Sequence, residues 1–277
     1  MTLPWPVTLA VAPLAGVQGL RVRRRIPILP EAAGPTAGVA APAGRSPAHV
    51  SAGTVGCPAS LLVIGESTAA GCGVSHHAEG MAGALAGLLA DADDAPVRWR
   101  VVGRFGATAR AVRHDLLPLL DREAPHTPGA DVVRAAPTAC GARRAEGHRA
   151  GGVPTYDLAV LLIGVNDLLV LRSERAWARD LASLIAELRP HATRLLVAGL
   201  PPMRSFGSLP RPLRDVLADH AERLDAVSAR VCGAGDAGFV SSHGLRVEQA
   251  FFARDGFHPS AAGYARWAAL ICEHARP

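Results

Sequence analysis

Five short, mostly apolar runs alternate with helical patterns along most of this chain, and this alternation limits the possible folds more than any other feature. The runs are LLVIG (61–65), VRWRVV (97–102), LAVLLIG (158–164), RLLVAGL (194–200) and GFV (238–240). Continuous apolar runs such as LLVIG and LAVLLIG are typical of strands buried on both faces, whereas VRWRVV alternates as a strand does. Strands that alternate with helices predict a parallel sheet covered by helices on both sides. The sequence therefore predicts an α/β fold with about five parallel strands.

The intervening stretches carry apolar residues at helical spacing. Helices are predicted around Met81–Leu89 and over residues 107–120, 173–188, 213–231 and 261–275. Before the last helix, Pro259 favours an extended conformation for the preceding residue, so His258 is expected on a loop. Ser260 is expected to cap the helix that follows.

Residues 1–56 are expected to form an arm and a linker ahead of a single domain over residues 57–277. Residues 1–20 are uncharged and mostly apolar, and RVRRR (21–25) follows. Prolines and glycines within the apolar stretch argue against a helix that spans a membrane. We expect a loosely structured arm that contacts a membrane surface through residues 1–25, with an anchor as the alternative.

Two other stretches lack periodicity. Residues 30–56 are rich in proline, alanine and glycine, which predicts a linker or a draped extended segment. Residues 125–154 combine proline, glycine, alanine and arginine without a pattern, which predicts a mobile surface insertion in the domain.

Composition excludes several classes of function. The net charge is +5 and the chain has no lysine, so Schiff-base chemistry, a Ser-Lys pair and a phosphate-loop lysine are excluded. The dispersed charge and the 4% aromatic content argue against nucleic acid as a partner. Five cysteines without a CxxC pair indicate reduced thiols and a cytoplasmic protein. His76 and His77 are adjacent and cannot face one metal from a regular element, so no metal site is expected.

Polar and glycine-rich segments follow the predicted strands and precede the last helix. They are GESTAAG (65–71), GRFGATA (103–109), GVND (164–167) and DGFH (255–258). Ligands of open parallel sheets bind beyond the carboxyl ends of the strands. We therefore expect these segments to converge at one edge of the sheet.

Three residues in these segments suit acyl transfer. Ser67 is the candidate nucleophile, His258 the candidate base, and Asp255 the partner that orients the histidine. We expect Asp255 to be relatively exposed, because it lies on a loop only three residues from the histidine. The alternative is structural: Ser67 and Thr68 cap a helix, and Asp255 braces the entry to the last one.

Candidate donors to an oxyanion are the Ser67 N–H, the Gly106 N–H and the side-chain amide of Asn166. Gly103 is the alternative to Gly106, and both glycines also suit simple turns. Asn166 is the only asparagine in the chain. An oxyanion-hole role therefore deserves more weight for it than for an ordinary turn residue.

The four segments together resemble the SGNH (GDSL-type) hydrolase superfamily, whose blocks appear here in family order over residues 61–264. The resemblance implies a flavodoxin-like three-layer α/β/α sandwich, with Ser67, Gly106, Asn166 and His258 as the signature residues and Asp255 as the histidine's partner. The lead-in RVRRR…LPEAAGP (21–35) is similar to that of a bacterial lysophospholipase- or esterase-like subset.

Two features depart from the family pattern. Glu66 stands where the family has an aspartate before the serine, and the insertion at 125–154 has no counterpart. The resulting hypothesis is a serine hydrolase that cleaves carboxylic esters, small or lipid-like, through an acyl-enzyme and without metal or organic cofactor. The alternatives are an acyltransferase that uses the same residues, and a non-catalytic module that binds phosphate or carbohydrate through GESTAAGCG (65–73).

Overall fold

A computed structural model of the chain describes residues 5–44, 59–122 and 156–275. Its centre is one six-stranded sheet with the strand order β1-β3-β2-β4-β5-β6. The strands are β1 (Ala37–Ala40), β2 (Ala59–Gly65), β3 (Val97–Gly103), β4 (Tyr156–Leu162), β5 (Ala192–Ala198) and β6 (Gly238–Val240). Strands β2 to β6 pair in parallel, and each overlaps one of the five predicted runs. The predicted parallel α/β architecture is confirmed.

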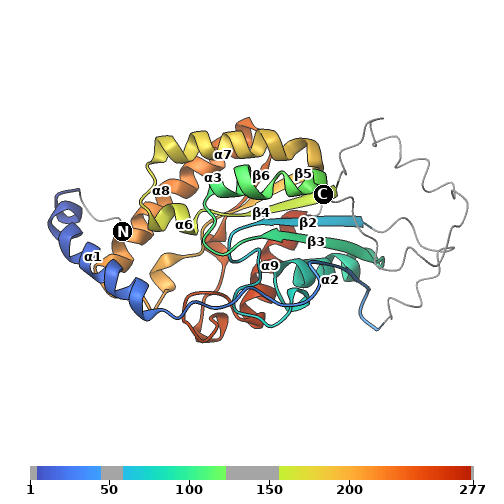
Figure 1. Ribbon diagram of the computed structural model, residues 1–277, viewed down its shortest axis with the longest axis horizontal. Coiled ribbons are helices and arrows are strands. Elements are labelled where there is room, and N and C mark those ends of the chain that lie inside the picture. The colour runs from blue at the N-terminus through green and yellow to red at the C-terminus, as the bar shows by residue number, and fades with distance from the viewer. Residues whose placement is uncertain (1–4, 45–58, 123–155, 276–277) are drawn as a thin grey trace, which may run out of the picture.

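Helices cover both faces of this sheet (Figure 1). The longer ones are α1 (Trp5–Arg25), α2 (Met81–Asp93), α7 (Glu174–Leu188), α8 (Leu213–Ala234) and α9 (Ala261–Ala275). Helices α7 and α8 lie over one face, whereas α2 and α9 pack together on the other. The fold is therefore a three-layer α/β/α sandwich.

Two hydrophobic clusters explain why the apolar run in β2 is continuous. In β2, Leu62 and Ile64 pack into the cluster beneath α7 and α8. Their neighbours Leu61 and Val63 point the other way, into the cluster beneath α2 and α9. Because successive side chains of a strand alternate between faces, a strand buried on both sides needs apolar residues at every position.

Short elements complete the layers. They are α3 (Ala109–Ala111), the π-helical turn η3 (Val112–Leu116), α4 (Leu119–Arg122), α6 (Val165–Leu169) and the 3-10 turns η2 (His77–Glu79), η5 (Arg189–His191), η6 (Met203–Ser205), η7 (Ser242–Gly244) and η8 (Gln249–Phe251). The single helix predicted over 107–120 is thus divided. Pro118 lacks an N–H, and the Leu117 N–H bonds five residues back to the Val112 carbonyl, which widens the turn.

The sixth strand, β1, comes from the stretch predicted as a linker or extended segment. It pairs antiparallel with β3 at the edge of the sheet, with Ala37 opposite Arg100. Its sequence, AGVA, shows no apolar alternation because Gly38 packs directly on the Trp99 ring. A Cβ at Gly38 would lie 2.5 Å from that ring, so only glycine fits there.

The apolar N-terminal stretch forms helix α1 instead of a loosely structured arm. Ala15 is buried, and Val22 packs against the core cluster. The Gln18 side chain bonds to the Arg211 carbonyl and accepts from the Leu213 N–H at the start of α8. Within the described residues, no helix is long and apolar enough to cross a membrane. The insertion predicted at 125–154 lies outside the described residues.

Candidate active site

Ser67 follows β2 directly, at the carboxyl edge of the sheet. A tight turn holds it there, because the Ala70 N–H bonds to the Glu66 carbonyl and the Cys72 N–H bonds to the Ser67 carbonyl. The end of β3 packs on this turn: a Cβ at Gly103 would lie 2.4 Å from the Ala70 nitrogen. Close packing against the turn therefore explains Gly103.

The predicted serine, histidine and aspartate form a continuous hydrogen-bonded chain. His258 Nε2 lies 3.0 Å from Ser67 Oγ, and His258 Nδ1 lies 2.6 Å from Asp255 Oδ2. The other Asp255 oxygen accepts the backbone N–H groups of Phe257 and His258 at 2.9 and 3.0 Å. One loop thus orients the imidazole from its far side while its near side faces the serine.

Asp255 is buried, so the expected exposure of this residue is wrong. Its side chain is 0% exposed, because the loop folds its carboxylate inward onto its own backbone. Burial opposes ionisation of the carboxyl. The hydrogen bonds from the His258 ring and from the Phe257 and His258 backbone outweigh that effect and hold the pKa of Asp255 below its usual value. The carboxylate is therefore poised to stabilise a cationic imidazole.

The glycine loop after β3 presents Gly106 in a left-handed conformation, with φ at +75°. A Cβ there would meet no atom within 4 Å, so backbone conformation and not packing favours glycine. Among the described residues, neither the Gly106 N–H nor the Ser67 N–H has an acceptor. Both backbone donors are free to bind a ligand, as the sequence analysis predicts for oxyanion donors.

Asn166 lies at the start of α6, and its amide is already engaged. Its Nδ2 donates to Glu66 Oε2 at 2.5 Å and to the Ala107 carbonyl at 3.2 Å. The backbone N–H groups of Val165 and Asn166 donate to the same glutamate, each at 3.0 Å. To donate to an oxyanion, the Asn166 amide must first give up one of these two hydrogen bonds. The bond to the Ala107 carbonyl is the longer of the two and is the one we expect it to exchange.

Glu66 connects the nucleophile turn to the GVND segment and is itself buried. Burial raises the pKa of its carboxyl to about 7, further supported by the neighbouring Asp167 and countered by the hydrogen bonds from Asn166 and Val165. Asp167 in turn accepts the Ala109 N–H at 2.9 Å, which joins the same segment to the glycine loop. Neither bridging role was predicted from the sequence, although Glu66 lies in the GESTAAG segment and Asp167 in the GVND segment.

Glu31 is a third residue that the sequence analysis missed. Its carboxylate accepts the Phe105 N–H at 2.6 Å, one residue before Gly106. The next residue, Ala32, donates its N–H to the Ala70 carbonyl of the nucleophile turn at 3.0 Å. The LPEAAGP segment therefore braces both the glycine loop and the nucleophile turn. In the sequence, the only sign of such a role was the similarity of this segment to the lead-in of related proteins.

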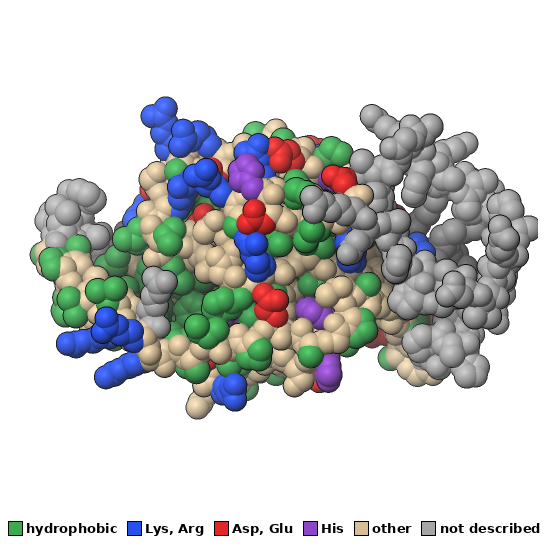
Figure 2. Space-filling model, viewed as in Figure 1, with side chains coloured by type: hydrophobic (Ala, Val, Ile, Leu, Met, Phe, Trp, Pro, Cys, Tyr) green, Lys and Arg blue, Asp and Glu red, His purple; other side chains and the backbone are tan. Residues whose placement is uncertain are grey.

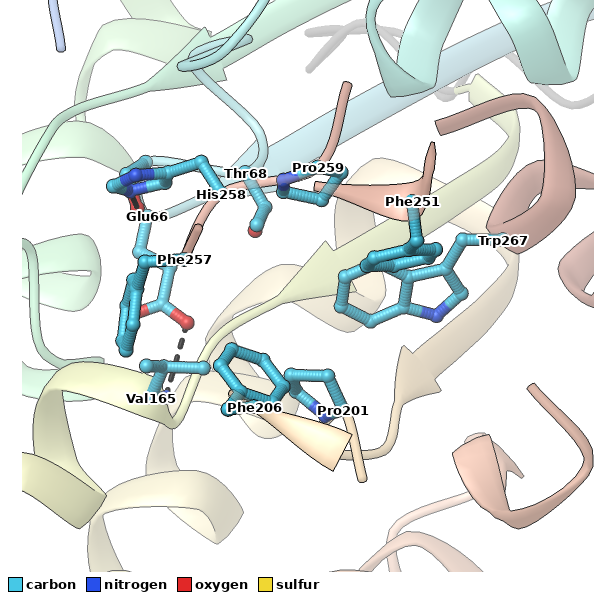
Figure 3. A pocket seen from close by; sticks show the side chains of 11 residues that line it. Glu66, Thr68, Val165, Pro201, Phe206, Phe251, Phe257, His258, Pro259 and Trp267 are labelled. Atoms are coloured by element: carbon cyan, nitrogen blue, oxygen red, sulfur yellow. Dashed lines mark hydrogen bonds between the residues drawn. The ribbon is translucent and has the colours of Figure 1, made fainter. Parts of the chain in front are cut away.

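A pocket opens beside Ser67 and His258 (Figure 3). Its walls are mostly aromatic or apolar and come from the segments after β4 and β5 and from the last part of the chain: Val165, Pro201, Phe206, Phe251, Phe257, Pro259 and Trp267. The His258 ring lies close to the rings of Phe105 and Phe257, with centroids 6.0 and 5.5 Å away. Within the described part of the chain, no three His, Cys, Asp or Glu side chains are grouped to hold a metal ion.

The sequence is similar to those of several known proteins. The sequence model of the GDSL-like lipase/acylhydrolase family matches residues 63–266, which include every predicted site residue. A GDSL-like esterase of Mycobacterium tuberculosis is 27% identical over 217 residues, covering 76% of this chain and 60% of that esterase. The chain thus spans less than two thirds of the length of this relative.

Solved structures share the fold. An acetyl-xylooligosaccharide esterase variant from Geobacillus stearothermophilus superposes with a TM-score of 0.52 at 18% identity, covering 80% of this chain and 95% of that one. A lipase/acylhydrolase from Enterococcus faecalis gives a TM-score of 0.52 at 16% identity, over 78% and 94% of the two chains. At these identities the likeness concerns the fold, and it agrees with the three-layer sandwich.

Proposed function

The chain belongs to the GDSL-like lipase/acylhydrolase family, a family of ester-cleaving enzymes, and from this premise we propose that it is a serine esterase. The observation that carries the proposal is the buried chain of hydrogen bonds from Asp255 through His258 to Ser67. A serine hydroxyl is a weak nucleophile until an adjacent base accepts its proton. Here His258 Nε2 is in position to accept it.

The reaction proceeds in two steps. His258 takes the proton of Ser67 as Oγ attacks the ester carbonyl, and the tetrahedral intermediate collapses when the histidine returns that proton to the leaving alcohol. Water, deprotonated by His258, then attacks the acyl-enzyme, and His258 returns the proton to Ser67 Oγ as the acid leaves. Asp255 stabilises the imidazolium in both steps, because its carboxylate stays ionised and fully buried beside Nδ1.

The developing oxyanion is stabilised by the free N–H groups of Ser67 and Gly106, with Asn166 as a third donor after it releases the Ala107 carbonyl. The aromatic pocket beside the serine suits an apolar acyl or alcohol group. Within this proposal the substrate is a carboxylic ester with an apolar part. No step needs a metal or an organic cofactor.

The test is hydrolysis of a panel of chromogenic acyl esters by the wild type and by Ser67→Ala. The variant is expected to lose turnover by about 10³-fold or more while its thermal unfolding stays unchanged. Ser205→Ala, an exposed serine on η6, is the matched control and is expected to behave as the wild type. Wild-type rates in Ser67→Ala would refute the assignment.

Two alternatives are tested alongside. A non-catalytic binding module does not need Ser67 and His258 within reach of each other, so their 3.0 Å separation favours catalysis. An acyltransferase would use the same residues but pass the acyl group to an alcohol or sugar. Product analysis with competing acceptors distinguishes it from the hydrolase.

A further inference from the structure

Exposed hydrophobic side chains are concentrated on three segments of the chain. Of the ten large hydrophobic side chains that are exposed among the described residues, eight lie on α1 and the stretch just after it, on the glycine loop, and at the end of α6. These eight are Leu14, Val17, Leu20, Ile28, Phe105, Leu169, Val170 and Leu171. Val170 and Leu171 are 66% and 62% exposed, so neither side chain belongs to the hydrophobic core. Exposed apolar side chains that are concentrated in this way usually mark an interaction site, whereas single scattered ones do not.

All three segments lie at the carboxyl end of the sheet, which is the end that carries Ser67. The Phe105 ring contacts the His258 ring. Helix α6 follows β4 directly. Helix α1 is tied through Gln18 to the start of α8, which follows the carboxyl end of β5. Figure 1 shows α1 and α6 at the end of the molecule toward which the parallel strands run.

Helix α1 has two distinct faces. Ala15 is buried and Val22 packs against the core, whereas Leu14 and Val17 on the opposite side are 53% and 47% exposed. The same outer face carries Arg21 and Arg24 farther along the helix, because positions 14, 17, 21 and 24 fall on one side of a helix. Figure 2 shows hydrophobic side chains on this end of the molecule, bordered by a group of basic ones.

An apolar surface beside exposed arginines has the chemistry of a site for an anionic lipid interface. Apolar side chains enter the acyl boundary, and arginines bind the phosphate groups and the negative surface potential. Each arginine near such a surface contributes roughly a five-fold gain in binding. Arg21, Arg24 and Arg25 are all exposed at the end of α1, so together they would contribute on the order of 100-fold.

We propose that α1, the glycine loop and the end of α6 form one surface that docks on an anionic lipid bilayer, beside the Ser67 site. The proposal rests on the proposed ester hydrolysis and deepens it: the substrate is an ester of an amphiphilic lipid taken from that bilayer. Docking holds the apolar rim in the interface and brings the substrate's acyl carbonyl to Ser67. The helix lies on the bilayer and does not cross it.

The first test measures binding of the full chain to sedimented vesicles of phosphatidylcholine, with and without phosphatidylglycerol. The wild type is expected to bind the anionic vesicles on the order of 100-fold more tightly than the neutral ones. Leu14→Ser with Val17→Ser and Leu20→Ser is expected to abolish binding to both. Arg21→Gln with Arg24→Gln and Arg25→Gln is expected to remove the preference for the anionic vesicles, a loss on the order of 100-fold.

The matched control is Val39→Ser with Arg98→Gln. Val39 is exposed on β1 and pairs with the exposed Arg98 near the start of β3, at the opposite end of the sheet. This variant removes one apolar and one basic group and is expected to bind as the wild type. Equal loss of binding in the control would overturn the proposal, because the effect would not belong to the proposed surface.

The second test separates docking from catalysis. On a water-soluble short-chain ester, the α1 variants are expected to turn over as the wild type, whereas on a lipid ester presented in anionic vesicles they are expected to fall at least ten-fold. A wild type that binds vesicles yet hydrolyses no ester refutes the proposed function and leaves docking intact. A wild type that hydrolyses soluble esters but binds no vesicle refutes docking alone.

Light scattering tests whether the same surface instead joins two copies of the chain. If the wild type is a dimer, and the Leu14, Val17 and Leu20 substitutions dissociate it, the docking proposal is overturned.

Discussion

The two sides of Ser67 are built differently. On the base side, the four-residue loop 255–258 supplies both His258 and the aspartate that orients it. On the oxyanion side, the contacts join three segments that lie far apart in the sequence. Asp255 bonds to the ring and backbone of His258, three residues away. Asn166 instead bonds to Glu66 and Ala107, which are 100 and 59 residues away. The base side is therefore set within one loop, and the oxyanion side depends on how separate loops pack.

This difference has a physical consequence for substitutions. A change at Asp255 removes contacts that all lie within its own loop. A change at Asn166 or Glu66 alters both local chemistry and stability, because these side chains join separate segments through hydrogen bonds. Substitutions on the two sides of Ser67 should therefore differ in how much they affect turnover relative to stability.

The largest effect among these variants is expected for Asp255→Asn. The buried carboxylate is not screened by solvent, so replacing it is expected to lower kcat by about 10⁴-fold, as in the serine-protease triad. The melting temperature should change little, since an asparagine oxygen can still accept a backbone N–H.

A matched control is Ser208, which contacts the same loop from a distant segment. Ser208→Ala removes the hydrogen bond from Ser208 Oγ to the Gly256 carbonyl, at 2.7 Å, and is expected to leave kcat near the wild-type value. If Asp255→Asn were destabilised but fully active per folded molecule, the aspartate would only brace the last helix. That outcome would break the comparison on its base side.

Asn166→Ala is expected to lower kcat by about 10²–10³-fold, the usual loss for one oxyanion donor. It should also lower the melting temperature, because the bond to Glu66 and the bond to Ala107 are both lost. Steady-state kinetics and thermal unfolding on one sample measure the two effects. A loss of stability with unchanged kcat would mean that the amide only joins the loops.

The raised pKa of Glu66 should make the free energy of unfolding depend on pH. Its pKa is about 7 in the folded protein, against an ordinary value of 4.5, so the folded state binds more protons between these values. The free energy of unfolding therefore falls as the pH rises from about 4.5 to about 7, by about 3 kcal/mol from this group, and its contribution is constant above.

Glu66→Gln cannot titrate and should lack this slope. Denaturant unfolding at several pH values, for the wild type and the variant, measures the difference between the two curves. The absolute stability of the variant is not the readout, because a glutamine cannot accept every N–H that the carboxylate accepts. Parallel curves across the window would contradict the buried-carboxyl account.

The smallest effect is expected for Glu31. Glu31→Ala removes the acceptor for the Phe105 N–H and is expected to lower kcat about ten-fold with KM little changed, because the glycine loop loses its brace. Glu31→Gln keeps an acceptor oxygen and is expected to restore most of the activity.

Glu79→Ala is the control for this pair. Glu79 also accepts a backbone N–H, from Ser75 at 3.2 Å, but it does not contact the glycine loop. It is expected to leave kcat unchanged. Equal losses in Glu31→Ala and Glu31→Gln would mean that charge, and not the brace, is what the glycine loop needs.

The parts of this protein that could be predicted from sequence are those held by local interactions. Strands buried on both faces carry a continuous apolar run, as β2 and β4 do, and β3 alternates as a strand does, so β2 to β6 were evident from short patterns in the sequence. The loop around His258 follows from Pro259 and from Ser260, whose hydroxyl accepts the Gly263 N–H at 3.2 Å as a helix cap should. Each of these signals spans only a few residues, which is why one sequence was enough.

Only the tertiary structure decided the contacts between distant segments. Helix α1 forms because its buried face packs on α8, and β1 forms because Gly38 fits against Trp99, neither of which appears in a local pattern. Glu31 meets Phe105 across 74 residues, and Asp255 is buried because its loop turns inward. Such contacts depend on the relative positions of separate loops, and those positions arise from the packing of the whole sandwich.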